Sequence, residues 1–344
     1  MVLDEECDIN PQGNREMEVS TRIQDSFMER LAGFRWENLF LFMAFLLMCG
    51  TFTVLSPDFL SFSNFLNVLR QSSIVLFLAS GQTLALLSAG IDLSQGSIVS
   101  LVSVITADVM MRGYGVSAGI LAGVGVGTLC GLINGLWIGK ARLNPFIMTL
   151  GMNYMASGVA LLYTGGDSIF GLPKESLEIF GWIGEGDLCG LPIPLILGGL
   201  NLVIVYFFLN HTKLGRHIYV VGGSEEAAVV SGINVPRVKV AIYTLSGLLS
   251  AIGGVILSAR CISGQPILGG GTILMESIGA TVIGGTSLFG GEGGILRTVL
   301  GVLIMAFGVN GLNLLATSTY MQDMIVGGII IFSVWIGILR RREG

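Results

Sequence analysis

Residues 116–139 read VSAGILAGVGVGTLCGLINGLWIG, an apolar run without a charged side chain. About 20 mostly apolar residues cross a bilayer core, so this run predicts a membrane-spanning helix. Glycine recurs in it at every fourth position, at Gly119, Gly123, Gly127, Gly131, Gly135 and Gly139. Residues four apart lie on one ridge of a helix, and a ridge without side chains predicts close packing against a neighbouring helix. A sliding surface used in gating is the alternative role for this ridge.

The whole chain has the composition of a membrane protein. Hydrophobic residues make up 52% of it and charged residues 12%, whereas a soluble domain carries about 25% charged residues. The mean hydropathy is +0.79. We therefore predict an all-α membrane protein of about ten transmembrane helices, some of them broken or re-entrant. The predicted spans are 38–56, 71–89, 97–111, 116–139, 145–164, 191–210, 239–258, 272–289, 295–315 and 321–339.

Basic residues orient these spans, because cytoplasmic loops carry the excess of lysine and arginine. With the N-terminus inside, only Arg70, Arg112, Lys174 and Arg260 fall in outer segments, and the other fourteen of the eighteen basic residues fall in inner ones. An even number of spans then places both termini in the cytoplasm. Residues 1–35 are polar and acidic, which predicts a disordered cytoplasmic tail before a transmembrane domain at 36–344.

Two connections between spans are long, and we expect residues 165–190 to face outward and residues 211–238 to face inward. The inner connection predicts a short helix, because Ser224 suits the N-cap and Glu225 and Glu226 suit the positive N-terminal end. Gly232 suits the left-handed position after its last turn. A protruding helix of this kind indicates docking onto a partner, and a connector on the membrane surface is the alternative.

Polar side chains in or beside the spans are candidates for a translocation path, because an unpaired polar group in lipid costs several kcal/mol and must face protein or a cavity. A hydrogen bond between helices is the alternative role of each, and Asp92 could instead cap the helix expected near Ser97. Both histidines lie in the inner connection, and no metal-ligand cluster or catalytic arrangement is visible. The candidate path residues are Gln82, Asp92, Asn134, Asn144, Asn153, Glu276 and Asn310.

Two glycine-bounded segments can be laid over one another. Gly90-Ile91-Asp92-Leu93-Ser94-Gln95-Gly96 aligns with Gly285-Thr286-Ser287-Leu288-Phe289-Gly290-Gly291 through two glycines and one leucine. Duplicated, glycine-broken segments are typical of transport paths, although three matches can also arise by chance.

The inner connection resembles the coupling loop of sugar permeases of ABC importers, of the ribose type, within the branched-chain amino acid and sugar permease superfamily. The resemblance rests on Gly215-Arg216, on the run from Gly222 to Ala228, and on Ser231-Gly232-Ile233. Residues 87–97, 144–151 and 283–291 resemble the same permeases, and the likeness extends from about residue 36 to the C-terminus. The acidic tail lies outside it.

The resemblance implies a multi-pass permease domain in the bacterial inner membrane that imports a monosaccharide, ribose or a similar pentose or hexose. It implies that a cytoplasmic ATPase binds the coupling helix, formed by Ser224, Glu225, Glu226, Ala227, Ala228, Ser231, Gly232 and Ile233. It also implies a second permease copy, the same chain or another, and an extracytoplasmic sugar-binding protein. ATP and Mg²⁺ would bind the ATPase, because this chain has no G-x-x-x-x-G-K-[ST] motif and we expect it to bind no cofactor.

Two other functions remain open from the sequence. A gradient-driven secondary transporter of a small polar solute would need Asp92 or Glu276, since its coupling ion binds ionisable groups inside the membrane. A membrane scaffold or receptor would move no substrate. The sequence leaves open which sugar is carried and whether Cys189 and Cys261, both in predicted outer loops, form a disulfide.

Overall fold

The computed structural model describes residues 36–343, so the predicted tail of residues 1–35 lies outside the described residues. The described residues fall into two units that divide inside α2, after Leu46. Its elements are α2 (Trp36–Leu55), α3 (Phe62–Leu87), α4 (Gln95–Met111), α5 (Gly115–Gly139), α6 (Pro145–Thr164), α7 (Lys174–Glu185), β1 (Asp187–Leu188), β2 (Leu191–Pro192), α8 (Ile193–His211), α9 (Lys213–Gly223), α10 (Glu225–Val230), α11 (Val235–Cys261), α12 (Thr272–Ile283), α13 (Ile295–Leu314) and α14 (Thr319–Glu343).

Each of the ten predicted spans overlaps a helix, and the described residues are mostly helical, which is consistent with the all-α prediction; their strands are the two-residue β1 and β2. Among the described residues, α5, α6, α8, α11 and α13 are long and apolar enough to cross a membrane. Shorter apolar stretches lie within α2, α4, α12 and α14. Side chains on the outer faces of the long helices are apolar and exposed, as a lipid-facing surface requires; Leu162 is 85% exposed and Leu121 72%.

Two span boundaries differ from the sequence prediction by more than four residues. Helix α3 begins at Phe62, nine residues before the predicted start, because the Ser61 side chain caps it by accepting a hydrogen bond from Asn64 N. Helix α12 ends at Ile283 instead of residue 289, because the glycines that follow adopt turn conformations; Gly285 has φ +80° and Gly290 φ +85°.

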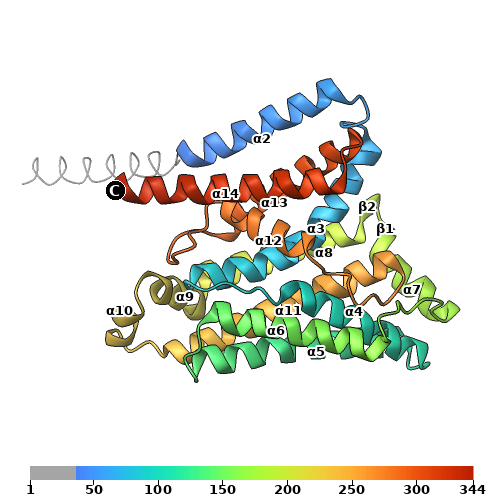
Figure 1. The fold of residues 1–344 in the computed structure, drawn as a ribbon, viewed down its shortest axis with the longest axis horizontal. Coiled ribbons are helices and arrows are strands. Elements are labelled where there is room, and N and C mark those ends of the chain that lie inside the picture. The colour runs from blue at the N-terminus through green and yellow to red at the C-terminus, as the bar shows by residue number, and fades with distance from the viewer. Residues whose placement is uncertain (1–35, 344) are drawn as a thin grey trace, which may run out of the picture. The chain divides into compact units, whose positions relative to one another are not determined.

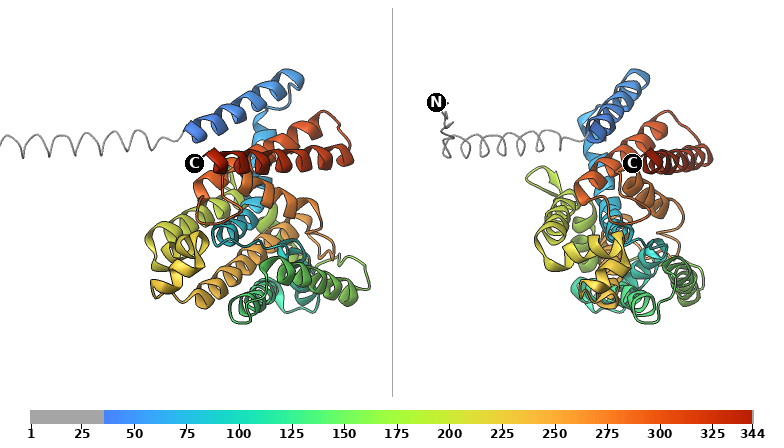
Figure 2. Two further views of the ribbon diagram at one scale, coloured as in Figure 1. Left: turned by 60° about the vertical axis from the view of Figure 1, so that its left-hand side comes forward. Right: turned by 90° about the vertical axis from the view of Figure 1, so that its left-hand side faces the viewer.

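Helix α11 is central to the unit formed by residues 47–344. It packs against α3, α4, α5 and α7 (Figure 1). The turned views show α5 and α6, in green, beside α4 (Figure 2). Every residue of α3 from Ser72 to Leu87 is buried, so this half of the helix is surrounded by protein on all sides.

The glycine ridge of α5 contacts two helices. Its first half lies against α4, where a Cβ on Gly119 would stand 2.8 Å from Thr106 O. Its second half lies against α11, where a Cβ on Gly131 would stand 2.8 Å from Gly247 Cα. The missing side chains therefore let the α5 and α11 backbones touch, which is the packing role expected of such a ridge.

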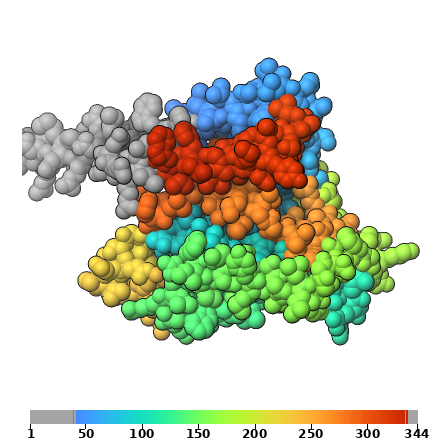
Figure 3. Space-filling model, in the orientation of Figure 1, coloured from blue at the N-terminus to red at the C-terminus, as the bar shows by residue number. Residues whose placement is uncertain are grey.

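The two long connections lie at opposite ends of this unit. The segment α9–α10 forms one end, and α7 with the β1–β2 hairpin forms the other (Figure 1). In the space-filling view the yellow residues of α9–α10 project from their end (Figure 3). The hairpin turns at Cys189 and Gly190, both with positive φ, and pairs Leu188 with Leu191.

Candidate functional site

A buried polar cluster surrounds Asp92, in the segment between α3 and α4. The Asp92 side chain is fully buried. Its Oδ1 accepts hydrogen bonds from Ser94 N at 3.0 Å and Ser94 Oγ at 2.6 Å, and its Oδ2 accepts one from Ser246 Oγ at 2.6 Å. The Asp92 carboxylate therefore closes a turn before α4 and binds α11, and the bonds to Ser94 take the place of the predicted cap near Ser97.

The cluster extends through amide side chains. Asn134 Nδ2 on α5 donates to Ser94 Oγ at 2.9 Å. Gln95 Nε2 donates to Ser246 Oγ at 3.1 Å and to Leu78 O at 3.0 Å, and Gln95 Oε1 accepts from Ser277 Oγ at 3.3 Å. Hydrogen bonds thus connect the segment between α3 and α4 with side chains of four helices, α4, α5, α11 and α12.

Several buried side-chain polar atoms lack a hydrogen-bond partner among the described residues. Both amide atoms of Gln82 on α3 are buried and unpaired, as are Asn134 Oδ1 and Tyr243 OH. Water or substrate normally satisfies such atoms. Gln82 and Asn134 were both predicted as path residues, and of the two only Asn134 is joined to Asp92, through Ser94.

The other candidate path residues lie apart from this cluster. Asn144 is the N-cap of α6 and accepts from Phe146 N at 2.9 Å. Asn310 exchanges two hydrogen bonds with Asn64, of 2.8 and 2.9 Å, which is the helix–helix contact considered as its alternative. Asn153 on α6 and Glu276 on α12 are partly exposed.

The sequence reasoning missed Ser94, Gln95, Ser246 and Tyr243 as members of the cluster. Serine is frequent in buried helices and carries no charge to draw attention. A signal was present, since Ser246, Ser250 and Ser258 are separated by multiples of four residues and mark one polar side of α11.

The second candidate site is α10, which is one short helix with both ends capped. Ser224 Oγ accepts from Ala227 N at 3.1 Å, and Gly232 follows the helix with φ +76°. Ala228 is buried, and the Glu225 carboxylate pairs with Lys239 on α11. Glu226 is exposed, as are Val229 (62%) and Val230 (89%). The inner face of α10 therefore attaches the helix to the bundle. Its outer face exposes the Glu226 side chain and two valine side chains.

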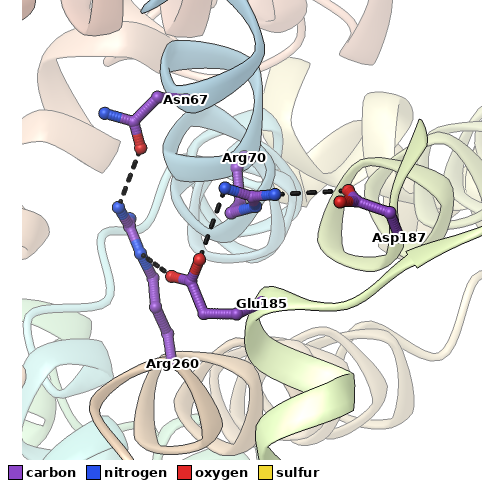
Figure 4. Close-up of polar contacts among 5 residues, drawn as sticks. All are labelled: Asn67, Arg70, Glu185, Asp187 and Arg260. Atoms are coloured by element: carbon purple, nitrogen blue, oxygen red, sulfur yellow. Dashed lines mark hydrogen bonds and ion pairs between the residues drawn. The ribbon is translucent and has the colours of Figure 1, made fainter. Parts of the chain in front are cut away.

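A network of ion pairs lies at the opposite end (Figure 4). Glu185, the last residue of α7, pairs with Arg70 on α3 at 3.3 Å and with Arg260 on α11 at 3.1 Å. Arg70 also pairs with Asp187 at 3.3 Å, and Arg260 donates to Asn67 Oδ1 at 3.1 Å. The network fastens α7 and the hairpin to the ends of two buried helices.

Cysteine and metal chemistry take no visible part at either site. Cys189 and Cys261 are exposed and free, like the buried or half-buried Cys130 and Cys49. Within residues 36–343, no group of three or more histidine, cysteine, aspartate or glutamate residues could hold a metal ion.

Comparison with known proteins identifies the family of the chain. The chain is 38% identical to the ribose import permease protein of Escherichia coli K12 over 86% of this chain and 91% of the relative. It is 42% identical to that of Bacillus subtilis 168 over 82% and 87%, and 35% identical to the D-allose transport system permease protein of E. coli K12 over 87% and 91%. No solved structure matches the chain. Residues 64–334 match the family described as the permease component of branched-chain amino acid transport systems, and the chain belongs to that family.

Proposed function

We propose that this chain is the membrane-spanning subunit of an ATP-driven importer for a monosaccharide, ribose or a similar pentose or hexose. The observation that carries the proposal is the near full-length similarity to permeases named for ribose and allose. The chain is the permease component, and the ATPase activity of such an importer resides in a separate subunit.

We infer a topology of ten spans with both termini in the cytoplasm of a bacterium, across its inner membrane. The end that carries α9 and α10 faces inward, and the end that carries α7 faces outward. Lys213, Arg216, Arg237 and Lys239 lie in or beside α9 and α10, which fits the excess of basic residues on cytoplasmic loops. The outer end has Arg70 and Arg260, and both are neutralised by the ion-pair network.

The outer face of α10 is the proposed docking surface for the ATPase. Val230, the last residue of α10, is 89% exposed beside the exposed Val229, and exposed apolar patches mark sites where partners bind. Two ATPase subunits bind and hydrolyse ATP with Mg²⁺, and this chain binds neither. A second permease copy completes the path, and an extracytoplasmic sugar-binding protein delivers the sugar to the α7 end.

The sugar path is lined by neutral hydrogen-bonding groups. Gln82 and Asn134 are the strongest candidates, because each has a buried amide atom without a partner among the described residues. Amide groups match the donors and acceptors of sugar hydroxyls without the strong hold of a charge. The acidic residue of the polar cluster, Asp92, is engaged with Ser94 and Ser246 and serves structure in this account.

The test is uptake of labelled ribose by cells that carry the complete transport system with this chain as its sole permease. A protonophore that dissipates the proton gradient, with ATP maintained, should leave uptake within about twofold of its starting value. Depleting ATP should abolish uptake. Loss of uptake with the protonophore alone would instead support the gradient-driven alternative, and Asp92 and Glu276 would then be examined as ion sites.

The binding residues are tested separately with Gln82→Leu, which has nearly the same volume and no amide. It should raise the ribose concentration for half-maximal uptake by about 5- to 30-fold, since a lost hydrogen bond in a binding site costs about 1–2 kcal/mol. Asn310→Leu is the matched control, because its amide is already satisfied by Asn64. An unchanged half-maximal concentration in Gln82→Leu would remove Gln82 from the path.

A further inference from the structure

The loop Gly284–Gly294, between α12 and α13, lies between the end of α9 and the end of α3. Gly291 N donates a hydrogen bond to Leu87 O at 3.0 Å, and Leu87 is the last residue of α3. A Cβ on Gly290 would stand 2.8 Å from Ala89 N and 2.6 Å from Gly222 O. One loop therefore touches the backbones of both helix ends at once.

The contact with α9 is equally close from the other side. A Cβ on Gly222 would overlap Leu87 O and stand 2.7 Å from Gly291 N. Tyr219, one turn earlier on α9, donates its hydroxyl proton to Gly293 O at 3.2 Å. Any side chain at Gly222 would push α9, the end of α3 and the loop apart. Position 222 therefore requires glycine because of the lack of space, and not because of its backbone angles.

Only Gly223, the last residue of α9, separates Gly222 from Ser224. Ser224 is at the same time the C-cap of α9 and the N-cap of α10. Its backbone N–H binds Val220 O, and its side chain binds Ala227 N. A displacement of α10 therefore acts directly on the end of α9 that holds Gly222.

The contact with α3 leads in turn to the buried polar cluster. After Leu87 the chain passes through Ala89, at φ +58°, and Gly90, whose missing side chain leaves room for Tyr243 OH. Two residues later Asp92 binds Ser94 and Ser246. A shift at Leu87 is therefore passed within five residues to the group that joins α4 and α11.

We propose that the loop Gly284–Gly294 is a rigid connector that transmits the displacement of α10 to the Asp92 cluster, with Tyr219, Gly222 and Gly291 as positioning residues. The proposal rests on the docking role of α10 proposed above. The loop moves together with α9 as one body, since it is joined to α9 and α3 by backbone contacts with no intervening side chain.

The first test removes only the Tyr219 hydroxyl, with Tyr219→Phe. Burial raises the pKa of this phenol above its usual value, against the opposing effect of Arg297, so the group keeps its proton at neutral pH. In the complete transporter in proteoliposomes, sugar molecules moved per ATP hydrolysed should fall at least threefold, while the amount of bound ATPase stays unchanged. Tyr206→Phe on α8 is the matched control and should leave the ratio as it is.

The second test joins the two segments covalently. Gly223→Cys and Glu292→Cys, in a chain whose own cysteines are replaced by serine or alanine, place two exposed thiols beside one another, since Gly223 Cα lies 3.0 Å from the Cβ position of Gly291. A short bifunctional thiol reagent should link them, and linked protein should keep at least half of its uptake. Uptake below about a tenth in the linked protein, or no linkage, would overturn the proposal.

The outcomes separate this proposal from the docking role of α10. If Glu226→Arg leaves the ATPase bound to the permease, the docking role itself fails. If docking stands and Tyr219→Phe keeps the wild-type ratio of sugar to ATP, only the connector is refuted.

Discussion

Asp92 Oδ2 accepts a hydrogen bond of 2.6 Å from Ser246 Oγ, across 154 residues of sequence. The bond joins the segment between α3 and α4 to the middle of α11, the helix that packs against α3, α4, α5 and α7. It also fixes the Ser246 hydroxyl as the acceptor for Gln95.

Ser246→Ala tests how much the hydrogen bond between Asp92 and Ser246 contributes to stability. The substitution leaves a buried carboxylate oxygen and the Gln95 amide each short of one partner, and an unsatisfied buried group costs about 1–3 kcal/mol. We expect a lower midpoint of thermal unfolding in detergent. Ser250→Ala is the control, because among the described residues its hydroxyl binds only Ser246 O, within the same helix. Equal midpoints for the two variants would show that the Asp92 bond contributes little.

The glycine ridge of α5 gives a second prediction. Gly131→Ala should destabilise the protein by about 1–3 kcal/mol, because an added methyl group overpacks the site and forces the α5 and α11 backbones apart. Gly125→Ala, on the opposite face of the same helix, should be neutral or slightly stabilising, since nothing described lies within 4 Å of its Cβ position. Unfolding midpoints and expression in membranes measure both, and equal losses would contradict the packing role.

The ion-pair network at the α7 end should be sensitive to salt. Glu185→Gln removes one of the two ion pairs of Arg70 and the ion pair of Arg260, and exposed pairs of this kind contribute about 0.2–1 kcal/mol each. We expect faster proteolysis of the segment 165–190 at low ionic strength and a smaller difference from wild type at high salt. Glu178→Gln on α7 is the control, being exposed and without an ion pair among the described residues. A rate unchanged in Glu185→Gln would show that other contacts hold α7.

The contact of Tyr219 with Gly293 should persist at every physiological pH. Burial raises the pKa of Tyr219 above 10.0, so the contribution of its hydroxyl is fully present below about pH 10 and is lost as pH rises through the folded-state pKa. The difference in unfolding midpoint between wild type and Tyr219→Phe should be constant from about pH 7 to 9 and shrink above 10. A difference that already shrinks near pH 8 would mean the phenol is not shielded from water.

Local patterns in the sequence predicted the helices well. Runs of apolar residues are a local property, and each of the ten predicted spans overlaps a helix. The α10 caps were also readable, since Ser224 and Gly232 lie within a few residues of the backbone groups they serve. The early start of α3 could not be predicted from the sequence. Its first turns contain Asn64, Asn67 and Arg70, which lower the local hydropathy, and the long-range contacts that hold these side chains are not visible in the sequence.

The polar cluster could be predicted only in part, because its hydrogen bonds join residues that are far apart in the sequence. Asp92 and Asn134 were found because a charge or an amide in an apolar chain needs a partner, but the partners Ser94 and Ser246 are small and common. Helix α9 was missed because its polar surface resembles a loop. The contact of Leu87 with Gly291 has no sequence signal at all, since it is made by backbone atoms of residues 204 positions apart.

The most direct test of the central claim is purification of the tagged chain from its native membranes in mild detergent, with mass spectrometry of the proteins that accompany it. The account predicts that an ATPase with a nucleotide-binding motif co-purifies with wild type and with the control Glu178→Arg at the outer end. It predicts that Glu226→Arg on α10 loses this ATPase while its insertion and folding are unchanged. A chain that purifies alone and still accumulates sugar along an ion gradient in liposomes would contradict the ATP-driven importer.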